Sequence, residues 1–167
     1  DANYRQDLGR FGTLNLAGSW TRNLKHEFQE YPTDPIIDAL NDPYYSTDAK
    51  YKANVSAGWN KGRWTSTVYA NYLGPTPSYR ATLDQSGYGL AGARRLGSYT
   101  TVNGSVNFDL TEDLKLSFLV NNIANRMPDM DVGSYPGTDG EPYNRNNFDV
   151  LGRAYFIEAR WSFGKGK

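Results

Sequence analysis

An all-β fold, an antiparallel meander of strands, is predicted by three features of the sequence. Apolar and polar residues alternate with a period of two in several runs, as in strands with one apolar and one polar face. Short turns between these runs alternate with long polar connections. Aromatic residues, which make up 14% of the chain, recur at both ends of the apolar rows.

Six strands are predicted from the alternation, and each has an apolar and a polar row. In the third of them Val68 lies on the apolar face between Trp64 and Tyr72. Its neighbour Thr67 lies on the polar face. A soluble sheet with one packed face would alternate in the same way, so alternation alone does not identify what covers the apolar face. The predicted strands are 11–24, 51–60, 64–73, 99–110, 114–123 and 152–163.

The connections favour a membrane as the environment of the apolar face. Segments 61–63 and 111–113 are tight turns, whereas 25–50, 74–98 and 124–151 are long and polar. Structureless loops beyond roughly 12–15 residues are uncommon in compact soluble domains. Outer-membrane barrels, by contrast, have short periplasmic turns and long extracellular loops. The pattern therefore predicts a transmembrane antiparallel β-barrel meander.

The aromatic residues fit this interpretation, because they fall at two levels along the strands. With the tight turns placed at the periplasmic end, one group lies at that interface and the other at the opposite one, as in the aromatic girdles of such barrels. The predicted girdle comprises Trp20, Tyr51, Trp59, Trp64, Tyr72, Tyr155, Trp161 and Phe163.

Composition excludes several classes of function. Lys and Arg total 18, as do Asp and Glu, so no basic excess supports nucleic-acid binding. The absence of Cys excludes disulfide frameworks and thiolate metal sites. No apolar run approaches the ~20 residues of a membrane-spanning helix. We interpret residues 1–167 as one domain segment.

No catalytic, metal or cofactor site is predicted. The single His, His26, lies in a polar connection without an evident catalytic partner. The acidic segment with Asp129, Asp131, Asp139 and Glu141 suggests calcium, but its spacing fails the EF-hand pattern. The prediction is that the chain is not an enzyme.

Two motifs resemble those of TonB-dependent outer-membrane receptors. The segment "GRAYFIEARWSF" is similar to the terminal strand of that family, opening with Gly152 and Arg153 and ending at Phe163. The upstream segment "VNNIANRMPD" resembles the family's penultimate-strand motif. Its matching residues are Val120, Asn122, Ile123, Asn125 and Arg126. The resemblance is clearest over residues 99–163.

This resemblance implies a function and partners. Such receptors close about 22 strands around a plug, so the chain would be the C-terminal part of the barrel, contributing about six strands, with the plug domain outside it. The implied function is energised uptake of a scarce solute, such as a siderophore, vitamin, carbohydrate or peptide, across the outer membrane of a Gram-negative bacterium. The implied partners are outer-membrane lipid, the remainder of the barrel and plug, the TonB energising complex acting through the plug, and a small-molecule or oligomeric substrate.

The long connections would then hold the substrate-binding loops. Tyr and Arg are favoured at recognition surfaces, although they are also common in long surface loops. The candidates are Tyr44, Tyr45, Tyr79, Arg80, Tyr143 and Arg145. Two alternative interpretations stay open at the level of sequence: a non-transporting outer-membrane barrel or adhesin, and a soluble β-rich carbohydrate-binding module.

Overall fold

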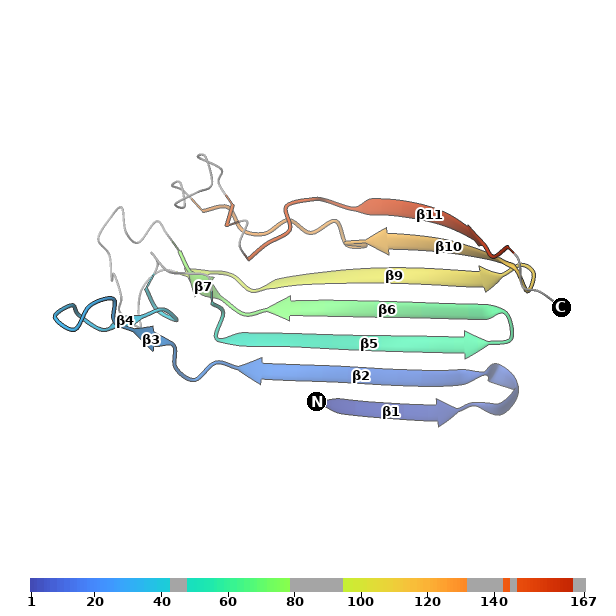
Figure 1. The fold of residues 1–167 in the computed structure, drawn as a ribbon, viewed down its shortest axis with the longest axis horizontal. Helices are drawn as coiled ribbons and strands as arrows, with labels where there is room; N and C mark the ends of the chain where they lie inside the picture. Colours follow the sequence, from blue (N-terminus) through green and yellow to red (C-terminus); the bar gives the residue numbers. More distant parts are fainter. Residues whose placement is uncertain (43–47, 79–94, 132–142, 145–146, 164–167) are drawn as a thin grey trace.

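A computed structural model describes residues 1–42, 48–78, 95–131, 143–144 and 147–163. Its main feature is a seven-stranded antiparallel sheet in which sequence neighbours are also neighbours in space, in the order β1-β2-β5-β6-β9-β10-β11 (Figure 1). The predicted all-β meander is therefore confirmed. The strands are β1 (Ala2–Asp7), β2 (Thr13–Arg22), β5 (Tyr51–Lys61), β6 (Trp64–Leu73), β9 (Tyr99–Asp109), β10 (Leu114–Asn121) and β11 (Ala154–Trp161).

Short turns join the strands at one end of the sheet, and long connections join them at the other (Figure 1). The long connections contain two small two-stranded sheets, one of β3 (Glu27–Phe28) with β4 (Ile37–Asp38), the other of β7 (Thr76–Pro77) with β8 (Arg95–Leu96). A 3₁₀ turn, Gly9–Phe11, lies between β1 and β2. Among the residues described, no helix has the length and apolarity needed to cross a membrane.

The sequence predicted six strands, and the structure adds a seventh, β1, which pairs with β2 along its whole length. Residues 2–7 escaped prediction because their alternation is weak. The row facing the same side as Leu14 and Leu16 consists of Ala2, Tyr4 and Gln6, so only one large apolar side chain marks it. Cross-strand pairing to β2, a non-local interaction, makes this segment a strand.

Glycines shape two of the short turns. Lys61 and Trp64 are the last residues paired between β5 and β6, and Gly62 and Arg63 form the turn between them. Gly62, the first residue of this turn, has φ of 56°. A positive φ at the first central position is what a type II′ hairpin turn requires. In the turn between β1 and β2, Gly12 has φ of 93° and ψ of −156°, a region essentially restricted to glycine.

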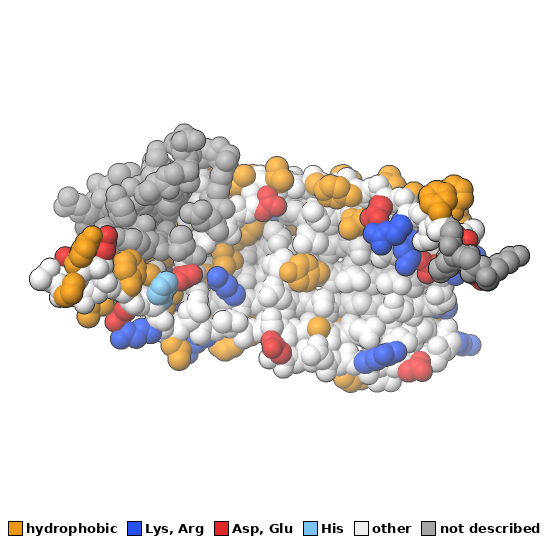
Figure 2. Space-filling view, viewed as in Figure 1, with side chains coloured by type: hydrophobic (Ala, Val, Ile, Leu, Met, Phe, Trp, Pro, Cys, Tyr) orange, Lys and Arg blue, Asp and Glu red, His pale blue; other side chains and the backbone are white. Residues whose placement is uncertain are grey.

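The register separates the residues of all seven strands into two faces. Val68 pairs with Ala57 and Gly104, and further pairs extend this apolar face to Leu16 on β2 and Ile157 on β11. Many of its large side chains are exposed, with Val68 at 50% and Ile157 at 84% of their full accessible area, and the others described are half-buried. By the register, the other face carries mostly Asn, Ser and Thr over the sheet. Figure 2 shows only isolated charged and hydrophobic side chains on the face turned to the viewer.

The buried hydrophobic residues lie at the loop end and not beneath the sheet. Leu96, Tyr99 and Phe148 form one cluster, against which Leu73 packs. The rings of Tyr99 and Phe148 meet edge to face with centroids 5.3 Å apart. Ala39, Leu40 and Ala49, in the connection between β2 and β5, are also buried. Within the described chain, therefore, the long connections pack on one another and no second layer covers the apolar face of the sheet.

Candidate functional site: a polar hollow beneath interlocked loops

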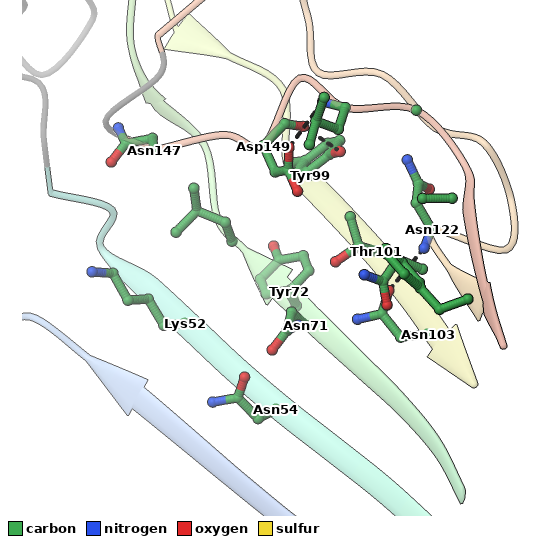
Figure 3. A pocket seen from close by; sticks show the side chains of 16 residues that line it. Lys52, Asn54, Asn71, Tyr72, Tyr99, Thr101, Asn103, Asn122, Asn147 and Asp149 are labelled. Carbon is green, nitrogen blue, oxygen red and sulfur yellow. Dashed lines mark hydrogen bonds between the residues drawn. The ribbon is translucent and has the colours of Figure 1, made fainter. Parts of the chain in front are cut away.

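A hollow of about 450 Å³ lies on the polar face where the strands meet the long connections (Figure 3). Side chains from β5, β6, β9, β10 and β11 line it, together with residues of the connection between β10 and β11. Uncharged amides and hydroxyls supply most of its polar groups, notably Asn54, Asn71, Thr101, Asn103 and Asn121.

Register places three of these side chains in one row. Asn54 pairs with Asn71, and Asn71 pairs with Thr101 across the next strand boundary. Neighbouring strands lie about 4.8 Å apart, so the row presents polar groups at that interval across β5, β6 and β9. The position of the row depends on strand alternation, which points Asn71 to the side opposite Val68 and Tyr72.

Most of these polar groups have spare hydrogen-bonding capacity. Asn54 donates to the Ser19 hydroxyl at 3.4 Å, a long contact. Asn103 Oδ1 accepts from the backbone N–H of Asn122 at 2.8 Å, and its NH₂ group donates to no described residue. In the part of the chain that the structure describes, the side chains of Asn71, Thr101 and Asn121 make no protein hydrogen bond.

The corner beside the hollow is built from the two sequence motifs noted above, and they contact each other. Asn122 is in the left-handed region with φ of 50°, and its side chain closes a loop onto Arg126, donating to its carbonyl at 2.8 Å and accepting from its amide at 2.9 Å. Asn125 Oδ1 accepts from the Arg153 amide at 2.9 Å. A Cβ at Gly152 would lie 2.9 Å from the same Oδ1, so glycine fits there best.

Replacing Asn122 by alanine is expected to lower the free energy of unfolding by about 1–3 kcal/mol, because it removes two hydrogen bonds to the backbone of Arg126, whose carbonyl keeps only the bond from the Tyr99 hydroxyl. Asn122 is 5% exposed, and alanine also tolerates its left-handed conformation poorly. Denaturant unfolding measures the effect. The control is Asn121→Ala, since that side chain makes no protein hydrogen bond in the described structure; equal effects of the two substitutions would contradict the role of the corner.

Hydrogen bonds also join the three long connections at the loop end of the sheet. Arg95 donates to the Leu40 carbonyl at 3.1 Å, to Asn41 Oδ1 at 3.2 Å and to the Pro75 carbonyl at 3.3 Å. Burial lowers the pKa of Arg95, and the negative charge of Asp38 acts in the opposite direction. Arg95 therefore ties the first long connection to the second.

Two carboxylates tie the second connection to the third. Asp129 Oδ2 accepts from the Gly97 amide at 2.8 Å, and Asp131 Oδ1 accepts from the Ser78 hydroxyl at 2.8 Å. Both belong to the acidic segment that suggested calcium; Asp139 and Glu141 lie outside the described residues. No group of three or more potential metal ligands occurs among the residues that are described.

Removing the Arg95 hydrogen bonds is expected to loosen the connections and leave the sheet intact. The variant Arg95→Met keeps the aliphatic stem, so amide hydrogen exchange in 23–42 and 74–78 should quicken by about tenfold while exchange in β5 and β6 is unchanged. Arg63→Met is the control, because Arg63 donates to the Leu110 carbonyl at the opposite end of the sheet. Faster exchange throughout the sheet would contradict a role confined to the loops.

The predicted loop candidates stay predictions, and one of them lies among the described residues. Tyr143 is described and half-buried, whereas Tyr44, Tyr45, Tyr79, Arg80 and Arg145 lie outside the described residues. The amides that line the hollow were not singled out from the sequence. The sequence does contain a pattern that could have indicated them, because Asn recurs on the polar rows of β5, β6, β9 and β10. Only the register shows that these Asn residues lie side by side on neighbouring strands.

The predicted girdle side chains fall into two groups on the described sheet. Near the short turns, Trp64 and Phe108 have ring centroids 4.4 Å apart, and Trp59 Nε1 donates to the Phe11 carbonyl at 2.8 Å. The ring centroids of Trp161 and Phe163 are 4.7 Å apart at the same end.

The second group lies near the long connections, where the rings of Trp20 and Tyr51 stack with centroids 6.2 Å apart. The rings of Tyr155 and Phe118 stack with centroids 6.3 Å apart. Tyr72 is the cross-strand partner of Ala53.

Comparison with known proteins adds a likeness of fold. No protein-family model matches the chain, and no curated protein matches its sequence. Among solved structures, a mutant of the ferric enterobactin receptor from Pseudomonas aeruginosa matches with a TM-score of 0.51 and 14% identity. The match covers 96% of this chain and 21% of the receptor, so the chain spans about a fifth of that protein. The large antiparallel sheet thus resembles part of a β-barrel receptor.

Proposed function

We propose that the chain is a wall segment of a TonB-dependent outer-membrane transporter. In this proposal its strands span the outer membrane of a Gram-negative bacterium, its long connections face the exterior, and the complete protein takes up a scarce solute. The chain carries no catalytic group and uses no cofactor in this role. Its partners are lipid, the rest of the barrel and plug, the energising complex that acts through the plug, and the solute.

The observation that carries the proposal is the exposed apolar face that runs across the sheet, combined with buried hydrophobic residues that, among those described, lie at the loop end. A soluble sheet gains its stability by packing its apolar face against another layer. Here Val55, Val68, Phe118 and Ile157 are all exposed, and the described connections pack on each other instead of on them. A hydrocarbon environment removes this face from water without a second layer.

The sheet edges support a larger barrel. Strands β1 and β11 each have one partner in the described structure, so each leaves one row of backbone groups unpaired. Unpaired backbone groups in hydrocarbon cost several kcal/mol each, which is why membrane sheets close on themselves. Further strands on both sides of this segment would satisfy both edges.

The decisive experiment measures the intact mass of the polypeptide that carries this sequence, after extraction from isolated outer membranes with detergent. We expect a chain several times heavier than 18.7 kDa whose electrophoretic mobility changes on boiling. Uptake of its solute should stop when a protonophore removes the energising gradient. A freestanding 18.7 kDa protein that remains soluble without detergent would overturn the proposal and favour a soluble module. A barrel without gradient-dependent uptake would favour the non-transporting alternative.

A further inference from the structure

We propose that the polar hollow binds a neutral, polyhydroxylated ligand, an oligosaccharide, as the solute or as part of it. This inference rests on the proposed function and specifies its substrate class. It is carried by the hydrogen-bonding state of the lining, by its charge, and by an exposed aromatic ring beside it.

The free amides fit sugar hydroxyls. A side-chain amide offers two donors and one acceptor oxygen, and a sugar hydroxyl likewise both donates and accepts. Asn71 and Thr101 lie in one row, and neither makes a protein hydrogen bond in the described structure. Figure 3 shows Asn54, Asn71, Thr101 and Asn103 along the same side of their strands. Such convergent polar groups fix the orientation of a ligand in a pocket.

The charge of the lining argues against a strongly anionic solute. Of the residues that line the hollow, Lys52 and Asp149 carry the charges at neutral pH, and these charges are of opposite sign. Sites that hold carboxylates, phosphates or multiply charged chelates use clustered Arg and Lys. The described part of the hollow has no such cluster, so a neutral ligand is the better complement.

An exposed aromatic ring completes the arrangement. Phe156 is 49% exposed and lies on the polar face of β11, opposite Leu119. It lines the hollow together with Asn121 and Ala154, which are paired across β10 and β11. A flat apolar ring next to amides suits the apolar C–H face of a pyranose, while the amides take its hydroxyls.

The plug of the complete barrel is the competing occupant of this face. A plug surface packed there would also pair with these amides, since polar groups that become buried are nearly always hydrogen-bonded. The exposed Phe156 ring beside the amides favours a ligand in the upper hollow, and plug contact is treated as an outcome of the test.

The test uses the complete membrane protein that carries this chain, purified in detergent, and isothermal titration with maltohexaose, cellohexaose, xylohexaose and mannohexaose. Ferric enterobactin serves as the anionic comparison. We expect at least one neutral hexasaccharide to bind, and Asn71→Ala and Thr101→Val each to weaken it by about tenfold, in line with one lost hydrogen bond. The matched control is Asn107→Ala, an amide on the same face of β9 that does not line the hollow.

Three results would overturn the inference. The first is binding of ferric enterobactin without binding of any neutral hexasaccharide. The second is hexasaccharide binding that Asn71→Ala and Thr101→Val leave within twofold of the parent protein. The third is a lowered melting temperature of the ligand-free protein in both variants with unchanged hexasaccharide affinity, which would assign the amides to the plug. Gradient-dependent uptake of another solute would in each case leave the proposed function standing, whereas a soluble 18.7 kDa protein would refute both.

Discussion

Replacing Val68 by arginine is expected to destabilise the folded protein in lipid by about 2–4 kcal/mol, the cost of a charge on the lipid face near the bilayer midplane. Val68 lies near the middle of β6 on the apolar face, between Ala57 and Gly104 on the neighbouring strands. Because its side chain is already half exposed, arginine meets no packed layer, and the cost arises from the surrounding hydrocarbon. Urea unfolding of the complete protein in phospholipid vesicles measures it.

Thr67→Arg is the matched control, one residue away on the polar face of the same strand. Its Cα partners are Gly58 and Ser105, so an arginine there enters the polar side of the wall and should change stability by less than about 1 kcal/mol. Equal, small effects at both positions would indicate that water covers both faces and would contradict the membrane assignment.

Replacing Gly12 by alanine should prevent the turn between β1 and β2 from keeping its conformation. A Cβ at this position would clash with the Asn60 carbonyl oxygen and would lie 2.9 Å from Lys61 Cβ. The backbone angles of Gly12 are also essentially restricted to glycine. Together, strain and overpacking are expected to cost about 2–4 kcal/mol of the free energy of unfolding. The shift of the urea midpoint in lipid vesicles measures the loss.

Gly9 provides a control within the same turn. Its φ is 57°, a left-handed conformation, but a Cβ there would meet nothing within 4 Å. Gly9→Ala should therefore lower the free energy of unfolding by only about 1 kcal/mol, the cost of holding alanine in a left-handed backbone conformation. If both alanines reduced stability equally, the close approach of Asn60 to Gly12 would not matter, and the pairing of β2 with β5 near the turn would need revision.

Most strands could be predicted from the sequence because their faces are chemically different. The predicted segment 64–73 coincides with Trp64–Leu73, and 51–60 ends one residue before the observed end at Lys61. Both segments alternate strictly, so burial of one row in an apolar environment determines strand and register together. The segment of β1 does not alternate in this way, and it becomes a strand through its pairing with β2.

The candidate site was less predictable than the fold. Sequence reasoning placed it among the Tyr and Arg residues of the long connections, and most of those lie outside the described residues. The amide-lined hollow needs Asn71 beside Thr101, residues that are separated by a long connection in the chain. In the sequence, nothing distinguishes Arg95 from the other arginines of the long connections. Its hydrogen bonds to the Leu40 and Pro75 carbonyls depend on how these connections fold back onto each other.

The sequence by itself determined the all-β meander, the two faces of its strands and the aromatic ends of the apolar rows, because these are local periodicities of the chain. Tertiary structure alone decided three things: that residues 2–7 join the sheet, that the motifs around Asn125 and Gly152 contact each other, and that polar rows converge into a hollow. The physical reason is common to all three. Each depends on pairing and packing between segments distant in sequence, and local alternation carries no information about which distant partner a residue will meet.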